Sequence, residues 1–560
     1  MGNTLQHSIF ELAQSDPDAR ALGFYSGDRT CEWVTRGELA ASASRAAGRL
    51  TELGLEPGGV CVQVPYNDRF AVDVLLGTVA AGGLPLLVAP PAIQGLNSSL
   101  PDILHGIIAR TSAPVVVGAD TLRSMEDDLT TRHPSTQFVF GEDDFGSADP
   151  VSGWANRSED DLAGLQLTSG TTGFPRICMW RQRNVMAALE GMATAMAVSS
   201  DDVYLNWTPL YHDMGLMNNF MLCLTRGIPL VMMSPFEFVK RPASWMRGVF
   251  DTGATITWSP NFGFALAAQR VRDSEMEGVT LDHVRGFWNA AERIHYETIV
   301  AFKERFEPFG LAPDAVKTNF GCAENVGGAT FTPPDEEVPV EHVDATVLHE
   351  RQEAVVGGAP ESTVPVVGCG KPHPGITIHI LDDIGRDLPD GHVGHLALDT
   401  ASSMEGYLHD PESTAAAFSG HLLKTGDLGY QRDGEFFWTG RAKERIAVRG
   451  RKIDPSDFEA ALLPIADLRT GSFAAFGHDD ARVGTQKVVI VSEVRDERSR
   501  PVADIKADVK QAVFERLGVG VDDVVLVSSG TLTKTSSGKR RHRHFAEMYE
   551  RGELAPHEIV

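Results

Sequence analysis

The chain of 560 residues is poor in lysine and in positive charge overall. Lysine accounts for 12 of the 50 basic residues, and the first lysine is Lys240. The formal net charge is −26. This charge argues against a nucleic-acid-binding protein, which needs a basic surface to neutralise phosphates. It leaves anionic substrates open, because a local basic site can oppose the overall field.

The cysteines are also few and form no recognisable framework. There is no CxxC pair, which argues against a zinc site or a disulfide scaffold and is typical of reduced thiols in a cytoplasmic protein. The six positions are Cys31, Cys61, Cys178, Cys223, Cys322 and Cys369.

Targeting and membrane-spanning segments are not evident. Residues 1–9 have neither the basic region nor the apolar core of a signal peptide. The most apolar window, residues 71–93, contains Asp73, a Gly82-Gly83 pair and three prolines. It predicts a buried helix followed by a buried strand, so we expect no membrane insertion.

Several common catalytic fingerprints are missing as well. The chain contains no Walker A pattern, no GxGxxG, no GxSxG and no HExxH. These absences argue against P-loop kinases, dinucleotide-dependent oxidoreductases, serine hydrolases and zinc proteases.

What is present, first of all, is an alternation of predicted helices and strands. A Thr35-Arg36-Gly37-Glu38 capping box opens a helix over 36–53, and the alternation runs on to a strand over 315–320. Such alternation predicts an α/β fold with mostly parallel sheets covered by helices, in which ligands bind at the carboxyl ends of the strands.

The pattern changes beyond Thr330. Residues 333–365 are rich in Pro, Glu and Val with little periodicity, which indicates an insertion or a long loop. Antiparallel-type strands follow, and then a compact α+β pattern. A chain of this length should form more than one domain. We place the boundary near Arg441, giving a large domain over 1–440 and a small α+β domain over 441–560.

The segment Leu167–Arg176, LTSGTTGFPR, follows an apolar stretch that predicts a buried strand over 162–167. Its hydroxyls and glycines would offer a polyanion side-chain and backbone donors, and Arg176 would add charge. A simple surface turn has a similar composition, so the segment alone does not distinguish a phosphate-binding loop from a turn. The candidate phosphate-binding residues are Thr168, Ser169, Gly170, Thr171, Thr172, Gly173 and Arg176.

Four further stretches carry chemistry that a nucleotide site needs. Residues 206–215, NWTPLYHDMG, contain a His-Asp pair that could equally be a helix cap. In 319–324, NFGCAE, Phe320 could stack on a purine and Glu324 could hold Mg²⁺. Residues 424–429, KTGDLG, place a carboxylate in a predicted tight turn. Residues 530–543, GTLTKTSSGKRRHR, present Lys539, which could otherwise be one solvated lysine in a basic run.

Together these motifs resemble the adenylate-forming superfamily of acyl-CoA synthetases, peptide-synthetase adenylation domains and luciferases. LTSGTTGFPR resembles its phosphate loop, NFGCAE its adenine and magnesium motif, and KTGDLGY its ribose motif. GRAKERIAVRG resembles its hinge, and TSSGK its catalytic-lysine loop. They occur in the family's order and cover nearly the whole chain.

The resemblance implies attack of a carboxylate on the ATP α-phosphate, which gives an acyl-adenylate and pyrophosphate. It also implies a small barrel-like part in the large domain and a mobile C-terminal domain, with Lys443 as the hinge. Lys539 would bridge the carboxylate and the α-phosphate, and the phosphate loop would hold the β- and γ-phosphates. The other implied roles are Mg²⁺ binding by Glu324, adenine binding by Asn319, Phe320, Gly321, Ala291 and Glu292, and ribose binding by Asp427 and Arg441.

Within the superfamily the chain most resembles fatty acyl-AMP ligases. The similar stretches are LYHDMGL, MSPFEFVKRPASWM, SPNFGFAL and RGRKIDPSDFE, and FWNAAERI stands where those enzymes have a Gly-Ala-Glu-Pro turn. Glu324 lies 46 positions before Gly370, as expected if the chain carries the insertion that distinguishes acyl-AMP ligases. The resemblance therefore implies transfer to the phosphopantetheine thiol of an acyl carrier protein, not to free coenzyme A.

Some residues depart from the family pattern. Arg176 replaces a lysine, and His395 stands where glutamate is usual, a change without an interpretation. Trp258 replaces a small residue before Pro260. Bulk there predicts a short, medium-chain or functionalised acid. The residues expected at the acyl pocket are Trp207, Tyr211, His212, Trp258 and Asn289.

Three other functions stay open on the sequence. The chain could be an acyl-CoA or aryl-CoA ligase, or an enzyme of this fold that adenylates another small oxyanion. It could also be a non-catalytic nucleotide-binding relic, although such a relic would not need both Lys539 and Glu324.

Overall fold

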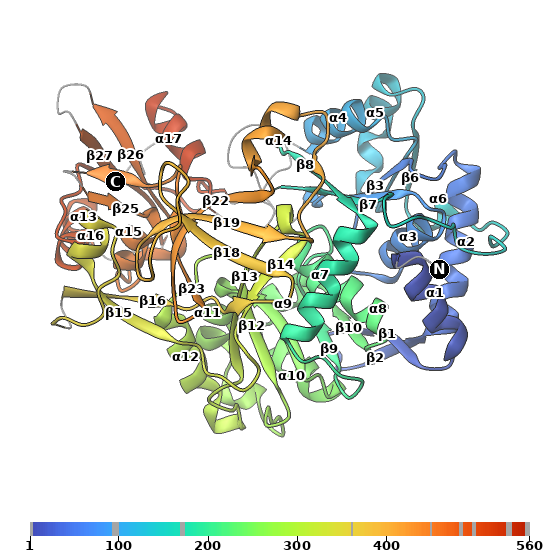
Figure 1. Ribbon diagram of the computed structural model, residues 1–560, viewed down its shortest axis with the longest axis horizontal. Coiled ribbons are helices and arrows are strands. Elements are labelled where there is room, and N and C mark those ends of the chain that lie inside the picture. Colours follow the sequence, from blue (N-terminus) through green and yellow to red (C-terminus); the bar gives the residue numbers. More distant parts are fainter. Residues whose placement is uncertain are drawn as a thin grey trace.

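The computed structural model describes a large N-terminal part and a smaller C-terminal part, which adjoins it at one end of the molecule (Figure 1). In the part of the chain that it describes, no helix has the length and apolar character needed to cross a membrane. The described residues are 4–91, 100–168, 174–359, 362–448, 451–480, 485–495, 500–533 and 540–554.

The first sheet of the N-terminal part has seven strands, parallel at its centre. The strands, in sheet order, are β20 (Gly406–Tyr407), β8 (Ile177–Arg181), β7 (Leu162–Leu167), β4 (Leu84–Leu87), β3 (Val60–Val64), β5 (Val115–Gly118) and β6 (Gln137–Phe140). The associated helices are α2 (Arg36–Glu52), α3 (Arg69–Ala80), α4 (Leu100–Thr111), α5 (Glu126–Arg132) and α6 (Glu142–Phe145).

Helices cover both faces of this sheet. Val60 and Val62 of β3 pack in a cluster with α4, whereas Cys61 between them packs with α2 and α3. Helix α2 begins with the predicted capping box: Glu38 N donates to Thr35 Oγ1 at 3.2 Å, and Thr35 N donates to Glu38 Oε2 at 2.9 Å. The α/β class predicted from the alternating pattern is confirmed.

The second sheet has nine strands and a long parallel centre. In sheet order the strands are β17 (Lys371–Pro372), β14 (Gly327–Phe331), β13 (Val316–Cys322), β12 (Gly286–Ala290), β11 (Ile256–Pro260), β9 (Tyr204–Asn206), β10 (Leu230–Met233), β1 (Arg20–Tyr25) and β2 (Cys31–Thr35). The helical segments are α1 (Leu5–Ser15), α7 (Gln182–Ala195), the π-helix η3 (Met214–Met221), α8 (Leu222–Arg226), α9 (Pro235–Lys240), α10 (Ala243–Thr252), α11 (Asn261–Arg270) and α12 (Tyr296–Phe306).

Six neighbouring strands of this sheet, β13, β12, β11, β9, β10 and β1, run parallel to one another. At the two ends of the sheet, β2 pairs antiparallel with β1, β14 with β13, and β17 with β14. Because β11, β12 and β13 are parallel neighbours, their carboxyl ends meet at one edge. The segments that follow them therefore converge there, as expected for ligand sites of parallel sheets.

A third, antiparallel sheet carries the predicted ribose motif. Its elements are β18 (Ile376–Leu381), β19 (Gly394–Thr400), β21 (Phe418–Ser419), β22 (Leu422–Arg432), β23 (Glu435–Arg441) and the helix α14 (Pro411–Ala417). The tight turn predicted over 424–429 is wrong, because these residues lie within strand β22. Gly426 takes φ +79° and the register shifts at Leu428, so the strand bends without ending.

The segment predicted as a long loop over 333–365 is also more ordered than expected. It contains β15 (Val340–Asp344) and α13 (Ala345–Arg351), and β15 pairs antiparallel with β16 (Thr363–Val367). Val343, Leu348 and Val364 pack with Tyr430 and Phe437 of the third sheet. The weak periodicity hid these elements, because their apolar residues pack against a neighbouring sheet and do not form a core of their own.

The C-terminal part has its own apolar core. Ile446, Phe458, Ile490, Val513 and Leu526 are buried together, and β27 pairs with both other strands of a three-stranded sheet. The elements are β24 (Ile446–Val448), β25 (Arg451–Ile453), α15 (Pro455–Leu462), β26 (Leu468–Asp480), β27 (Thr485–Val494), α16 (Val502–Leu517), β28 (Asp523–Val527) and α17 (His542–Glu550).

Candidate active site

The candidate phosphate loop connects strands β7 and β8, which pair as an antiparallel hairpin. Thr168 N donates to the carbonyl oxygen of Arg176 at 2.9 Å and closes the hairpin at the base of the loop. Five of the predicted residues, Ser169, Gly170, Thr171, Thr172 and Gly173, lie outside the described residues.

Glu324 lies directly after strand β13, in the short 3₁₀ helix η6 (Ala323–Asn325). Its Oε1 accepts a hydrogen bond from the hydroxyl of Tyr407 at 2.7 Å, and its backbone oxygen accepts from Met404 N at 2.7 Å. The Arg176 guanidinium lies 5.1 Å from the centre of the Tyr407 ring. Tyr407, on β20, thus connects the base of the phosphate loop to the predicted Mg²⁺ ligand. No sequence pattern pointed to it.

The environment of Tyr407 keeps its hydroxyl protonated. Burial and the nearby charge of Glu324 raise the pKa of Tyr407 well above its usual value. The phenol therefore acts as a hydrogen-bond donor to the carboxylate at neutral pH.

The adenine motif occupies the carboxyl end of β13. Phe320 packs edge-on against Phe436, with ring centres 5.3 Å apart. Gly321 leaves no room for a side chain, because a Cβ there would lie 2.5 Å from the carbonyl oxygen of Gly327. Asn319 is buried and donates to the carbonyl oxygen of Thr330.

Ala291 and Glu292 follow the neighbouring strand β12. Ala291 takes a left-handed φ of +70°, which is uncommon for a residue with a Cβ. Glu292 Oε1 accepts from Phe262 N at 2.6 Å, so its carboxylate satisfies a donor in the first turn of α11. This pair therefore ties the end of β12 to the helix that follows β11.

Asp427 and Arg441 face each other across strands β22 and β23. Arg441 Nε lies 3.3 Å from Asp427 Oδ1, which also accepts from Trp438 Nε1 at 3.0 Å. Only 3% of Asp427 is exposed, and its charge raises the pKa of Arg441 above the usual range. Trp438 is a further site residue that the sequence did not indicate.

A cavity of about 850 Å³ brings several of these residues together. On the side of the N-terminal part, it is lined by the predicted residues Ala291, Glu292, Asn319, Phe320, Gly321, Asp427 and Arg441. On the side of the C-terminal part, it is lined by residues that include Asp454, Ser456, Glu459, Arg540 and His542. Arg540 immediately follows the predicted catalytic residue Lys539, which lies outside the described residues.

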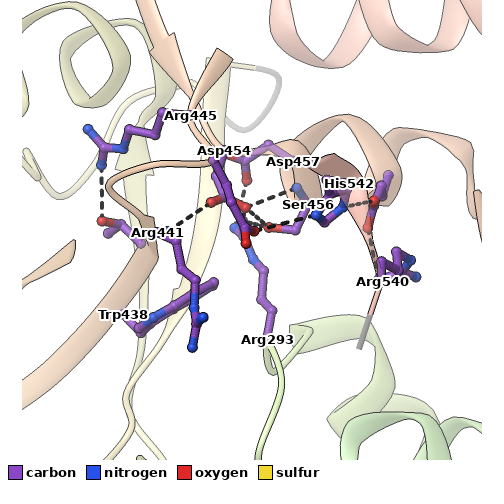
Figure 2. A network of polar contacts seen from close by, with 12 residues as sticks. Arg293, Trp438, Arg441, Arg445, Asp454, Ser456, Asp457, Arg540 and His542 are labelled. Atoms are coloured by element: carbon purple, nitrogen blue, oxygen red, sulfur yellow. Dashed lines mark hydrogen bonds and ion pairs between the residues drawn. The ribbon is translucent and has the colours of Figure 1, made fainter. Parts of the chain in front are cut away.

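The basic residues that follow Lys539 are held by carboxylates. His542 Nε2 lies 2.6 Å from Glu459 Oε1 and its Nδ1 lies 3.4 Å from Glu444 Oε2, while Arg540 Nη1 lies 2.8 Å from Glu459 Oε2 (Figure 2). Burial alone would lower the pKa of His542, but the two carboxylates outweigh it and raise this pKa to about 10. His542 is therefore a cation at neutral pH.

Several predicted residues do not line this cavity. Glu324, Thr168 and Arg176 form the separate group around Tyr407, and Lys443 is exposed in the turn after β23. The two groups are joined by β13 and its continuation, because Phe320 on the cavity wall is four residues from Glu324.

The residues expected at the acyl pocket lie inside the N-terminal part. Trp258 is fully buried and stacks on Trp288, with ring centres 5.3 Å apart, and Trp207 stacks on Phe238 at 3.9 Å. Asn289 Nδ2 donates to Asn261 Oδ1 at 3.2 Å. Among the described residues, no hydrogen-bond partner reaches the buried atoms Trp207 Nε1, Tyr211 Oη, Trp258 Nε1 and Asn289 Oδ1.

The His-Asp pair behaves in part as a helix cap. Asp213 accepts from Met214 N at 2.8 Å at the start of η3, and His212 Nδ1 lies 2.6 Å from Asp213 Oδ1. His395, the unexplained departure, lies 3.1 Å from Asp383 Oδ1 on an exposed part of the third sheet.

The donor chemistry at Glu324 fits a hard divalent cation. One carboxylate is a usual protein contribution to Mg²⁺, which takes its other ligands from phosphates and water. No hydrogen bond from the described residues reaches Glu324 Oε2. Within those residues, no cluster of three or more His, Cys, Asp or Glu side chains forms a complete protein metal site.

Comparison with known proteins agrees with this geometry. The sequence pattern of the AMP-binding enzyme family matches residues 9–408. The chain is 32% identical to a 4-hydroxyphenylalkanoate adenylyltransferase of Mycobacterium tuberculosis, over 90% of this chain and 89% of that protein. It is 28% identical to the medium-chain-fatty-acid–[acyl-carrier-protein] ligase JamA of Moorena producens, over 84% of this chain and 82% of that one.

Solved structures show the same fold. A structure from a study of fatty acyl-adenylate ligases of E. coli and L. pneumophila superposes with a TM-score of 0.90 at 25% identity, and covers 98% of both chains. The sequence match, the fold and the convergence of the motifs thus lead to one conclusion: the chain belongs to the AMP-binding enzyme family and is an adenylate-forming enzyme.

Proposed function

We propose that the protein activates a carboxylic acid with ATP as an acyl-AMP, releases pyrophosphate, and transfers the acyl group to the phosphopantetheine thiol of a carrier protein. One observation carries the proposal. The 850 Å³ cavity has Phe320, Asp427 and Arg441 on one wall and Arg540, the neighbour of Lys539, on the other. A nucleotide bound to the first wall would face Arg540, which immediately follows the lysine that the resemblance assigns to catalysis.

The side chains suit the roles that the reaction requires. Two anions must meet at the α-phosphate, so catalysis depends on positioning and on neutralising charge. Phe320 would stack on adenine, and the Asp427 carboxylate would accept from ribose hydroxyls. Glu324, oriented by Tyr407, would hold Mg²⁺ on the phosphates, where the metal supplies charge neutralisation. Lys539 would bridge the two reacting anions.

Domain rotation is part of the proposal. The C-terminal core begins at Ile446, and Lys443 is exposed in the turn that precedes it. We place the boundary at 440/441 and take Lys443 as the hinge between adenylation and thiol transfer.

Two observations support a carrier protein as the acceptor. JamA, which is similar over most of its length, is by name an acyl-carrier-protein ligase. The segment between Glu324 and Gly370 contains the elements β15, α13 and β16, which agrees with a structured insertion of the kind expected for acyl-AMP ligases. Incubating the adenylate with coenzyme A and, separately, with carrier proteins tests the acceptor. Efficient formation of a CoA thioester would show that coenzyme A, and not a carrier protein, is the acceptor.

The acid is proposed to be short, of medium length or functionalised. Trp258 and Trp288 stack on each other at the middle of β11 and β12 and fill space that smaller residues would leave. A Trp258→Gly variant should therefore gain activity with longer acids. If acids of graded length show no such gain, these tryptophans do not set the chain length.

The proposed activity itself is tested by pyrophosphate release over a broad panel of carboxylic acids. We expect acid-dependent release from the full chain, and loss of adenylation in Lys539→Ala with ATP binding largely kept. Full adenylation by Lys539→Ala, or no acid-dependent release with any acid, would contradict the proposal.

A further inference from the structure

Arg293 reaches from the N-terminal part into the C-terminal part. It follows Glu292 on the cavity wall, and its Nη2 lies 2.6 Å from Asp457 Oδ1. Its Nη1 donates to Ser456 Oγ at 2.6 Å and lies 3.7 Å from Asp454 Oδ1. Figure 2 shows this side chain pointing up into the carboxylates at the beginning of α15.

The contacts made by Arg293 are buried. Its side chain is 17% exposed, and those of Asp454 and Asp457 are 5% and 11% exposed. Burial alone would raise the pKa of Asp457, but the Arg293 charge and a contact with His349 hold it below the usual range. Without the guanidinium, this arrangement of the two parts would bury two neighbouring carboxylates without their main counter-charge. Such an arrangement is strongly unfavourable.

The same carboxylates contact the chain beside the predicted hinge. Asp454 Oδ2 accepts from Arg441 N at 3.3 Å, and a Cβ at Gly440 would lie only 2.0 Å from that oxygen. His349 of α13 adds a second contact to Asp457, with Nε2 and Oδ2 3.5 Å apart. Arg293 therefore acts on a cluster that touches the segment about which the C-terminal part would turn.

The orientation that Arg293 stabilises is the one that closes the nucleotide cavity. In this orientation Arg540 lines the cavity together with Phe320 and Asp427. We propose that Arg293 is a positioning residue that holds the C-terminal part in the orientation used for adenylation. The inference rests on the proposed function, in which the C-terminal part rotates between two half-reactions.

The kinetic test compares Arg293→Gln with a matched control. Arg305→Gln removes an arginine of similar exposure, 19%, that pairs with Asp273 inside the N-terminal part. We expect the maximal rate of pyrophosphate release to fall roughly 10- to 100-fold in Arg293→Gln. The KM for ATP should stay within about threefold, because the residue acts through the domain contact. Arg293→Lys should recover part of the rate, because its charge still reaches Asp457, and the control should behave like wild type.

The orientation of the C-terminal part is measured in a separate experiment, in the absence of the carboxylic acid and of the acyl acceptor. Glu297 and Arg516 form a 3.2 Å ion pair between the two parts, so a cysteine at each position reports this orientation by the yield of cross-linking with a short bismaleimide. Arg293→Gln should lower the cross-linking yield several-fold in that background, with folding checked by circular dichroism.

If Arg293→Gln leaves this yield unchanged, Arg293 does not position the C-terminal part. A raised KM for ATP with an unchanged maximal rate would contradict the positioning role as well. Failure of thiol transfer in wild type would contradict the proposed acceptor and leave the cross-linking result interpretable.

Discussion

Glu324 is held by neighbours from distant parts of the chain. Tyr407 donates to its carboxylate, and the Arg176 guanidinium lies over the same tyrosine ring. A hydrogen bond to a charged acceptor in a partly buried site is stronger than one on the surface. Tyr407 should therefore fix the direction of the carboxylate that is proposed to meet Mg²⁺.

Tyr407→Phe should weaken the use of Mg·ATP while leaving the fold intact. Loss of one hydrogen bond to a carboxylate corresponds to about a tenfold effect. We expect that change in the Mg²⁺ concentration needed for half-maximal pyrophosphate release. Tyr430→Phe is the matched control, because Tyr430 is also buried and donates to a glutamate, Glu341, at 2.8 Å. If both variants depend equally on the Mg²⁺ concentration, Tyr407 does not orient Glu324 for Mg²⁺ binding.

A second buried carboxyl lowers stability in a pH-dependent way. Burial raises the pKa of Glu435 from 4.5 to about 7, although a hydrogen bond from Gly370 N at 2.6 Å partly opposes the shift. Below pH 4.5 the side chain is protonated in both the folded and the unfolded state, so there is no cost. Above pH 7 it is ionised in both, and the full cost is present.

Glu435→Gln should therefore stabilise the protein at pH 8 and not at pH 4.5. The gain is on the order of 3–4 kcal/mol in the free energy of unfolding, from 1.4 kcal/mol for each pKa unit. Glutamine can still accept from Gly370 N. Thermal unfolding of both proteins at the two pH values measures the effect, and a gain of equal size at both would show that ionisation is not its cause.

At the scale of elements, α4 packs against the carboxyl side of the phosphate loop. Phe174, the residue after the undescribed loop residues, lies on Gly106 of α4, where a Cβ would approach its ring to 2.2 Å. Arg110, one turn further along α4, lies 3.8 Å from the centre of the same ring. The glycine is thus required by the close approach of Phe174, and the contact fixes the point where the loop rejoins β8.

Gly106→Ala should disturb this contact although alanine favours helices. Overpacking of this kind displaces side chains and backbone, and we expect about a tenfold rise in the KM for ATP. Combining it with Phe174→Leu, which shortens the opposing side chain, should restore the KM to within about threefold of the Phe174→Leu single variant. If the double variant is as impaired as Gly106→Ala, the contact with Phe174 is not the cause.

At the scale of the whole molecule, the apolar clusters of the N-terminal part are separate from those of the C-terminal part, and polar contacts join the two parts. The C-terminal core is separate, and contacts between the parts include the pairs Arg293–Asp457 and Arg516–Glu297. Polar contacts of this kind separate at lower cost than a continuous apolar core, which suits a part that must turn.

Lys443→Pro tests the hinge. Proline fixes φ near −65° and should restrict rotation about this residue. We expect pyrophosphate release within about twofold of wild type and transfer to the carrier protein lowered by about tenfold or more. Lys452→Pro is unsuitable as a control because it interrupts β25, so Lys443→Ala serves instead. Equal loss of both half-reactions would place the hinge elsewhere.

Some of this protein was determined by the sequence alone. The alternation of apolar helices and strands and the capping box at Thr35 are local patterns, and they predicted the α/β class. The order of the motifs predicted the family through its resemblance, and the adenine and ribose residues that the resemblance implies stay predictions. Those patterns work because periodicity and glycine requirements are properties of short segments.

Other features were decided only by tertiary structure. Tyr407 and Arg293 contact residues that are distant in the sequence, Glu324 and Asp457, because the fold places β20 beside η6 and α15 beside the end of β12. Trp438 contacts Asp427 because β22 and β23 pair. The turn predicted at Asp427 became a bent strand because β19 pairs with Leu423 and Lys424 before it, and β23 pairs with the strand from Asp427 to Arg432. The ordered elements in 333–365 exist because a neighbouring sheet supplies the apolar surface that their own sequence lacks. Long-range partners of this kind leave no local pattern, so the sequence could not show them.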